Sequence, residues 1–234
     1  HRWFDEFYGL LDGCCNFFDP SIPDPKYKGG RTRYFAQNFE RITEFPDDFY
    51  TTDAFTDHAV NAIERFSAGP RPFFLHLCYT APHYPLHARP EDIAKYADQF
   101  GDGWDAMRKR RFERQQELGL TDSSWQLSDK DSRAYDWETA DHEFEQSRMA
   151  VYAAMIDAMD QNIGRLVAAL EALGIADETL ILFLSDNGGC AEEPGGRDPT
   201  KRRPGPKDDY VAVGPAWGWA QNAPFRRYKQ WTHE

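Results

Sequence analysis

The sequence of 234 residues predicts an α/β fold in which helices flank a mostly parallel central sheet. Two apolar runs, Pro72–Thr80 and Leu180–Leu184, have the continuous hydrophobic character of strands that are buried on both faces. A long amphipathic helix is predicted between these runs, and a second helix is predicted before the first run. This alternation of helix and strand is typical of α/β proteins.

The first predicted helix covers Thr51–Ala68. Its apolar side chains recur at helical spacing and form one stripe: Phe55, Ala59, Ala62, Ile63 and Phe66. Thr52 or Asp53 is the predicted N-cap, and Gly69 with Pro70 ends the helix. Because the helix ends just before Pro72–Thr80, that run is expected to enter the sheet.

Residues 90–147 interrupt the alternation with a polar excursion. Asp105–Leu118 is predicted as a charged helix, and Thr121–Gln146 holds eight acidic residues against two basic ones. Such a composition is typical of a solvated face or loop. The excursion also contains three tryptophans, Trp104, Trp125 and Trp137. They favour instead a segment that packs down onto the rest of the protein as a lid or an edge insertion.

The longest predicted helix is Arg148–Leu173. Its apolar side chains follow the spacing of three and four: Met149, Tyr152, Met155, Ile156, Met159, Ile163, Leu166, Val167 and Leu170. Gly174 closes the helix. At about 1.5 Å per residue it is long enough to cross a whole sheet. Its methionines are expected to fill the core rather than to bind a metal, and Asp160 is interpreted as structural.

An oxygen-rich pair, Asp186 and Asn187, follows the predicted strand Leu180–Leu184 and precedes Gly188 and Gly189. Open α/β sheets bind ligands just beyond the carboxyl ends of their strands, and glycine allows a close approach there. Carboxylate and amide oxygens suit a hard cation such as Ca²⁺ or Mg²⁺. The pair is therefore a candidate metal site, although a simple Asx turn at the end of a strand would have the same sequence.

A histidine follows the other predicted strand. His83 stands between Pro82 and Pro85, which restrict the backbone of the loop after Thr80. The two strands are expected to end at the same edge of the sheet, so the imidazole would lie beside the metal pair and supply a proton or a hydrogen bond. A purely structural role is the alternative. His87 lies four residues further along the loop and is given no role.

Composition excludes several classes of function. The formal net charge of -12 argues against a nucleic-acid partner, because phosphate binding requires a concentrated basic face. No apolar run approaches the roughly 20 residues that span a bilayer. Four cysteines, of which two are adjacent, do not make a disulfide framework. The compartment stays open between periplasmic or secreted and cytoplasmic, and so does the oligomeric state.

A basic loop, Glu192–Asp209, follows the metal pair and is rich in Pro and Gly. Its basic residues, Arg197, Lys201, Arg202, Arg203 and Lys207, either face solvent or form a rim that attracts an anionic ester. Trp217 and Trp219 either form an aromatic wall of the site or pack the loop.

Several segments together resemble the sulfatase family, in particular the bacterial arylsulfatase-like branch of the alkaline phosphatase superfamily. They are Phe4–Gly9, Asn16–Pro20, Phe49–Ala59, Pro72–Ala88, Met149–Leu166, Leu180–Gly189 and Asn222–Glu234. The resemblance implies a three-layer α/β, alkaline phosphatase-like fold and the hydrolysis of a small-molecule or carbohydrate sulfate ester. It also implies a Ca²⁺ or Mg²⁺ ion held in part by Asp186 and Asn187.

The same resemblance assigns the catalytic and substrate-binding roles to His83 and Lys229. Lys229 corresponds to the lysine of the family that contacts sulfate, and either residue would protonate the leaving group. Three groups, the cation, His83 and Lys229, would then converge on the sulfate as charge grows on the leaving oxygen.

The chain departs from the family pattern at the nucleophile. The family uses a formylglycine made from a Cys or Ser in a C/S-x-P-x-R segment, and no cysteine here is followed by x-P-x-R. We therefore expect residues 1–234 to be an internal, incomplete part of a single catalytic domain, with the polar excursion as an insertion and the nucleophile in a preceding segment. Two alternatives are a phosphatase or phosphodiesterase of the same superfamily and a noncatalytic binding relic. Asn187 disfavours the first, because zinc sites prefer imidazole to an amide oxygen.

Overall fold

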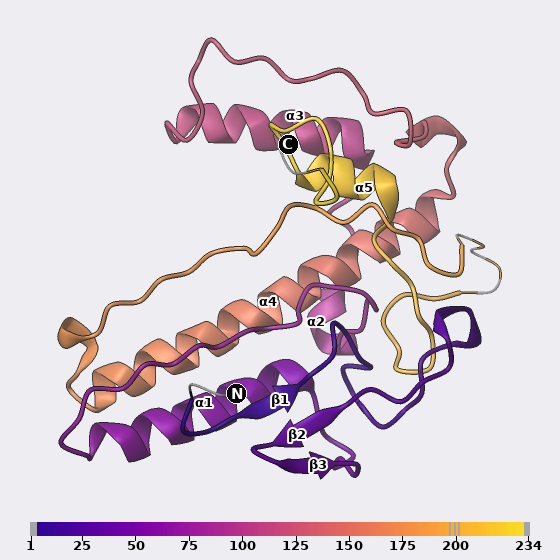
Figure 1. The fold of residues 1–234 in the computed structure, drawn as a ribbon. Helices are drawn as coiled ribbons and strands as arrows, with labels where there is room; N and C mark the ends of the chain where they lie inside the picture. The colour runs from indigo at the N-terminus through magenta and orange to yellow at the C-terminus, as the bar shows by residue number, and fades with distance from the viewer. Residues whose placement is uncertain (1–3, 197, 199, 201, 232–234) are drawn as a thin grey trace.

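Two long helices lie side by side along the molecule (Figure 1): α1 (Thr51–Ser67) and α4 (His142–Ala172). The structure, a computed structural model, describes residues 4–196, 198, 200 and 202–231. Helix α1 agrees with the prediction and buries the predicted residues Phe55 and Ile63. Its N-cap is Tyr50, so the prediction of Thr52 or Asp53 as the cap is wrong, and both residues lie inside the first turn.

Helix α4 begins earlier than predicted, at His142 rather than Arg148. The carboxylate of Asp141 caps it by accepting a hydrogen bond from the backbone amide of Phe144 at 3.0 Å. Glu143 and Glu145 occupy the first turn, where the helix dipole favours negative charge. The acidic residues at the end of Thr121–Gln146 are therefore not in a loop but form the start of α4.

The described residues contain one sheet, and it is small and antiparallel. Strands β1 (Tyr8–Leu10), β2 (Phe35–Gln37) and β3 (Glu40–Ile42) lie in the order β1-β2-β3. In the register of this sheet, Tyr8 is opposite Gln37, and Phe35 is opposite Ile42. Phe35 is fully buried and packs with Phe49 and Phe55, which fixes the sheet against α1. It is a different sheet from the predicted parallel one.

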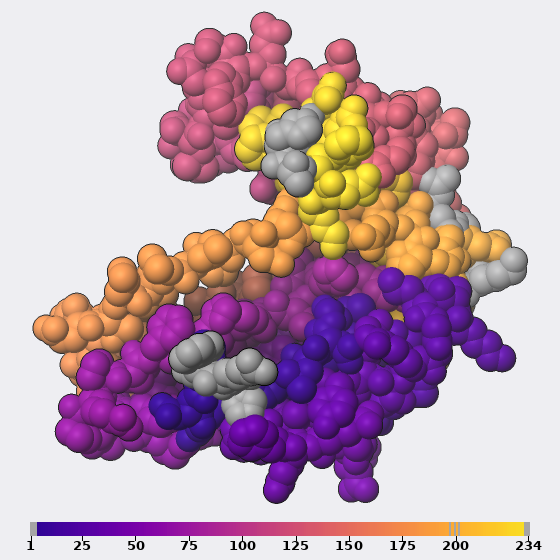
Figure 2. All heavy atoms as spheres, viewed as in Figure 1, coloured from indigo at the N-terminus to yellow at the C-terminus, as the bar shows by residue number. Residues whose placement is uncertain are grey.

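The two predicted strands of the parallel sheet do not pair with any strand in the described part of the chain. Their predicted burial on both faces is also wrong. The exposed fraction is 78% for Phe74 and between 50% and 84% for every residue of Leu180–Leu184, and Figure 2 shows this orange segment uncovered on the visible face. One face of Pro72–Thr80 is covered, because Leu77 and Tyr79 pack against the cluster of Phe35. A strand is buried only when neighbouring strands and helices cover it, and its own sequence cannot supply them.

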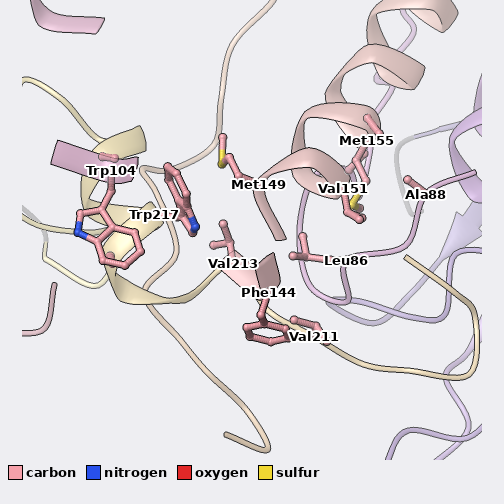
Figure 3. Close-up of a cluster of buried hydrophobic side chains, with 14 of the residues drawn as sticks. Leu86, Ala88, Trp104, Phe144, Met149, Val151, Met155, Val211, Val213 and Trp217 are labelled. Atoms are coloured by element: carbon pink, nitrogen blue, oxygen red, sulfur yellow. The ribbon is translucent and has the colours of Figure 1, made fainter. Parts of the chain in front are cut away.

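The main hydrophobic core lies around the N-terminal half of α4 (Figure 3). Trp104 of α3 (Gly103–Glu117) and Trp217 of α5 (Gly214–Gln221) are fully buried there, with their ring centroids 5.5 Å apart and their planes perpendicular. Trp137 packs at the edge of this core, whereas Trp125 is 51% exposed. Most of the tryptophans of the excursion therefore pack down. Trp217 and Trp219 are buried against the polar excursion, where they contact Trp104 and Arg108, and they do not form an open wall.

A buried cation, Arg108, joins α3 to the C-terminal segment. Its Nη1 donates to the carbonyl oxygen of Trp219 at 2.7 Å, and its Nη2 donates to those of Pro224 and Phe225 at 3.3 and 3.0 Å. The guanidinium also lies 4.4 Å from the centroid of the Trp219 ring. Burial lowers the pKa of Arg108 to about 10. The polar excursion is thus attached to residues 219–225 through backbone carbonyls.

The remaining elements are short: α2 (Pro90–Ala94) and the 3₁₀ helices η1 (Lys26–Lys28), η2 (Trp137–Thr139) and η3 (Ala176–Glu178). All four cysteines are free thiols, as expected. Among the described helices, none has both the length and the apolar character that crossing a membrane requires.

Candidate functional site

The loop after Thr80 turns sharply at His83. The backbone amide of His83 donates to the carbonyl oxygen of Thr80 at 2.9 Å, and the imidazole Nδ1 lies 3.0 Å from the carbonyl oxygen of Tyr84. Because a carbonyl oxygen only accepts, Nδ1 is the donor in this contact. The lone pair of the neutral ring is therefore on Nε2, which points away from its own loop.

The structure brings the two predicted catalytic residues together. Lys229 lies 146 positions from His83 in the chain, yet its Nζ is 3.2 Å from Nε2 of His83. An ammonium can only donate, so Lys229 donates to the lone pair of Nε2. Both side chains are half-buried, which leaves one side of the pair open to a ligand. The ammonium of Lys229 and the proton that it donates to His83 are therefore at the same half-buried position.

The loop that follows the candidate metal pair holds Lys229 in place. The backbone amide of Lys229 donates to the carbonyl oxygen of Gly189 at 3.0 Å. The amide of Gly189 in turn donates to Oδ1 of Asn222 at 3.1 Å, and Nδ2 of Asn222 donates to the carbonyl oxygen of Arg227. The loop after Leu180–Leu184 and the segment that carries Lys229 are therefore tied together by one backbone hydrogen bond and by the side chain of Asn222.

Glycine is required in this loop because α5 and the segment after it pass very close to it. A Cβ atom on Gly189 would lie 2.6 Å from the carbonyl oxygen of Gly218. A Cβ on Gly188 would lie 2.5 Å from Oδ1 of Asn222. The sequence predicted a close approach at these glycines, and the group that approaches here is the protein's own backbone and Asn222.

Asp186 and Asn187 are both exposed at the end of the extended segment. The charge of Asp186 raises the pKa of the Cys78 thiol, an effect second to burial, so the ends of the two predicted strands do lie near each other. Oxygen donors suit a hard cation, but these two side chains supply only part of the roughly six to eight oxygens that Ca²⁺ takes. No group of three or more His, Cys, Asp or Glu side chains that could hold a metal occurs in the described residues. The hydroxyl of Ser185 donates to the carbonyl oxygen of Asn187 at 2.8 Å, as in a turn.

Part of the predicted basic rim contacts a group of tyrosines that includes Tyr84, the residue after His83. Nη1 of Arg202 donates to the hydroxyl of Tyr27 at 2.8 Å and to the carbonyl oxygen of Tyr210 at 2.9 Å. The hydroxyls of Tyr27 and Tyr84 are 3.2 Å apart. Arg197 and Lys201, the other rim residues before Arg202, lie outside the described residues.

His87 is fully buried and has a structural environment. Its Nε2 donates to the carbonyl oxygen of Asp209 at 2.7 Å, and its Nδ1 accepts from the amide of Phe17 at 3.3 Å. Burial lowers the pKa of His87 to about 4. A separate cleft of about 510 Å³ is lined in part by Phe18, Phe45 and Ile93 and contains none of the predicted site residues.

The sequence profile of the sulfatase family matches residues 1–233. The chain belongs to the sulfatase family. It is similar to an arylsulfatase of Klebsiella aerogenes, with 30% identity over 244 residues that cover 99% of this chain and 52% of the relative. It is 29% identical to an uncharacterized sulfatase of Schizosaccharomyces pombe, over 100% of this chain and 45% of that protein.

A solved structure, that of Ps i-CgsB in complex with k-i-k-neocarrahexaose, is also similar to this sulfatase chain. The TM-score is 0.52 with 29% identity, and the match covers 80% of this chain and 33% of that one. The likeness assigns the chain to the α/β, alkaline phosphatase-like class. The chain spans about half the length of the two curated relatives that it matches.

Sequence reasoning missed Tyr27, Tyr84 and Asn222 near the candidate site, and it named Arg202 as a rim residue without its partners. Tyr27, Tyr84 and Arg202 form one contact network, although Tyr27 and Arg202 are 175 positions apart. Asn222 joins the glycine loop to the Lys229 segment. The run of tyrosines and basic residues is visible in the sequence, but nothing in it indicates which of them meet.

Proposed function

We propose that the protein of which these residues are part hydrolyses sulfate esters, with His83 and Lys229 binding the sulfate group. The approach of Lys229 Nζ to His83 Nε2 at 3.2 Å carries the proposal, because it gathers a cation and a proton donor at one open point. Membership of the family supports the reaction class. The substrate is a small-molecule or carbohydrate sulfate ester.

The pair would act on the leaving group. As the S–O bond breaks, negative charge grows on the bridging oxygen, and a donor placed at that atom stabilises the charge. The ammonium of Lys229 would stabilise that charge, and its proton that is hydrogen-bonded to Nε2 of His83 would pass to the leaving oxygen, either directly or through the imidazole, which leaves Lys229 as a neutral amine. The hydrogen bond from Nδ1 to Tyr84 keeps the imidazole in the orientation that this transfer needs.

Asp186 and Asn187 would hold part of a divalent cation, Ca²⁺ or Mg²⁺, through their side-chain oxygens. A bound cation would neutralise charge on the sulfate oxygens. The formylglycine nucleophile of the family has no counterpart in residues 1–234 and is expected in a preceding segment. Lys229 and Gly189 link the two parts of the site, since their backbones are hydrogen-bonded.

We further infer that Pro72–Thr80 and Leu180–Leu184 are strands of a mostly parallel central sheet that other residues of the protein complete. Their exposed apolar side chains and unpaired backbones support this, because such surfaces are stable only when covered. Residues 1–234 then belong to a single catalytic domain with residues 90–147 as an insertion. Hydrogen exchange provides the test: the amides of Leu180–Leu184 should exchange slowly in the full-length protein and fast in residues 1–234 alone.

Initial rates of the full-length protein with 4-nitrophenyl sulfate test the reaction. His83→Ala and Lys229→Ala should each lower turnover by about 10²-fold or more, because each removes a donor from the developing anion. Lys109→Ala removes an exposed lysine of α3 and is the matched control, expected within about twofold of the wild type. Thermal midpoints of the three variants report whether each is folded.

Two outcomes would contradict the proposal. Faster hydrolysis of 4-nitrophenyl phosphate than of the sulfate would identify a phosphatase of the same superfamily. No hydrolysis of either ester by the folded protein carrying a formylglycine would identify a noncatalytic relic.

A further inference from the structure

We propose that Arg202, Lys28 and Tyr27 form a second anion subsite beside the His83–Lys229 pair, which selects sulfated saccharides that carry a second sulfate. The proposal rests on the proposed function, since the first sulfate is the one that His83 and Lys229 bind. This tyrosine subsite consists of Arg202, Lys28 and Tyr27, together with Tyr84, which contacts Tyr27 and Lys28.

The tyrosine subsite adjoins the pair through the chain itself, because Tyr84 is the residue after His83. The hydroxyl of Tyr84 meets that of Tyr27 at 3.2 Å, and Nζ of Lys28 lies 5.3 Å from the centroid of the Tyr84 ring. Arg202 stacks on Tyr27 with its Cζ 4.8 Å from the ring centroid. Tyr84 is therefore the link through which the subsite would meet a substrate that is bound at His83.

The two cations of the subsite have no carboxylate partner in the described part of the chain. The nearby acids are engaged elsewhere: Asp24 pairs with Arg33, and Asp209 accepts from the backbone amides of Arg203 and Tyr210. In a chain with a net charge of -12, two cations without carboxylate partners, one over each ring of the Tyr27–Tyr84 contact, favour an anionic ligand.

The guanidinium of Arg202 is fixed in position but not saturated. Only Nη1 donates in the described contacts, to Tyr27 and to the carbonyl oxygen of Tyr210. A Cβ atom on Gly195 would lie 2.5 Å from both Nη2 of Arg202 and Cζ of Tyr27, so the loop backbone packs tightly against the stacked pair. An ordered guanidinium with spare donors suits a sulfate, whose oxygens accept hydrogen bonds in a fork.

Tyr27 supplies an apolar face. Its side chain is 44% exposed, and its hydroxyl is occupied by Arg202, Tyr84 and the carbonyl oxygen of Tyr210. The ring surface that remains open is available to the C–H face of a sugar. The subsite therefore combines a stacking surface with two cations, and a disulfated saccharide offers both a ring and a second anion.

Arg202→Gln and Lys28→Gln in the full-length protein test the subsite. Each has a matched neighbour as control, because Arg203 and Lys26 are exposed and their side chains have no contact among those described. Two substrates are compared: 4-nitrophenyl sulfate, with a single anionic group, and a disaccharide that carries one sulfate on each sugar. Arg202→Gln should raise KM for the disulfated disaccharide by about tenfold or more. The same variant should keep KM for 4-nitrophenyl sulfate within about twofold of the wild-type value.

Arg203→Gln and Lys26→Gln should change KM by no more than about twofold for either substrate. Equal losses on both substrates in Arg202→Gln would overturn the subsite, because they would indicate a structural role. Equal losses in Arg202→Gln and Arg203→Gln would also overturn it, because they would indicate only the general field of the loop.

Calorimetric titration with the disulfated disaccharide separates this proposal from the reaction itself. If the wild type hydrolyses neither substrate, the proposed function fails, and binding still decides the subsite. A loss of affinity of about tenfold in Arg202→Gln but not in Arg203→Gln supports it, and equal affinities overturn it.

Discussion

The carbonyl oxygen of Gly189 accepts a hydrogen bond from the backbone amide of Lys229 at 3.0 Å, so the loop after the candidate metal pair directly positions a candidate catalytic side chain.

Gly189→Ala should therefore disturb the site through the backbone. The new Cβ would meet the carbonyl oxygen of Gly218 at 2.6 Å, and neither group can rotate away. We expect lower turnover of 4-nitrophenyl sulfate and a lower thermal midpoint. Gly164→Ala is the control, because nothing lies within 4 Å of its Cβ position in α4. It should stabilise the protein by about 0.5–1 kcal/mol without changing turnover.

The double variant His83→Ala with Lys229→Ala should lose less turnover than the product of the fold-losses in the two single variants. The two side chains share one proton and one ligand, so each single variant already removes most of the function of the pair. Rates of the two single variants and the double variant with 4-nitrophenyl sulfate complete the cycle. Fully multiplicative losses would show that the residues act independently.

Asp186→Ala and Asn187→Ala should each weaken Ca²⁺ binding to the full-length protein by about tenfold or more, because each would remove one of the proposed oxygen ligands. Calorimetric titration measures this without any turnover. Glu192→Ala, an exposed carboxylate further along the same loop, is the matched control. Unchanged affinity in both variants would leave the pair as a turn held by the Ser185 hydroxyl.

His87 should make the protein less stable in acid. Its folded pKa is lowered from 6.5 to about 4, so the unfolded imidazole binds a proton at pH values where the buried one stays neutral. The stabilisation is complete above pH 6.5 and is lost as the pH falls towards 4, by about 3 kcal/mol. His87→Gln keeps an N–H donor for Asp209 and should flatten this part of the curve of unfolding free energy against pH. An identical slope in both proteins would contradict the assignment.

The exposed residues of Leu180–Leu184 should make residues 1–234 aggregate when expressed alone. Light scattering should fall in a Leu182→Glu and Leu184→Glu variant, because charge on an unpaired apolar strand blocks edge-to-edge association. Leu118→Glu with Leu120→Glu changes two exposed leucines at the end of α3 and should have a smaller effect. The isolated residues should also be inactive, and measurable turnover of an aryl sulfate by them would contradict the need for a formylglycine.

The three longer helices were predictable from the sequence because their signals are local, whereas α2 and α5 were not predicted. The spacing in Arg148–Leu173 identified α4, and its first six residues were missed, since acidic residues before an apolar stripe fit either a loop or a capped helix start. The parallel sheet depends on partners that the strand sequence does not contain, so Leu180–Leu184 could be recognised as apolar but not as exposed.

The candidate site was predictable in part for a similar reason. His83 and Lys229 stand in recognisable segments, and the structure brings them together. The contact of Tyr27 with Arg202 depends on how two irregular loops meet, and neither periodicity nor a motif records it. The convergence of Asp186 and Asn187 on one cation stays a prediction.

The buried guanidinium of Arg108 couples the polar excursion to the segment that carries the candidate residue Lys229. Its donors hold the carbonyl oxygens of Trp219, Pro224 and Phe225, just before the stretch that ends in Lys229. A relative without α3 would leave these carbonyl oxygens without the donors of the arginine, unless another group replaced it. Residues 90–147 and the candidate site are therefore expected to depend on each other, and exchanging this segment between sulfatases should alter turnover from a distance.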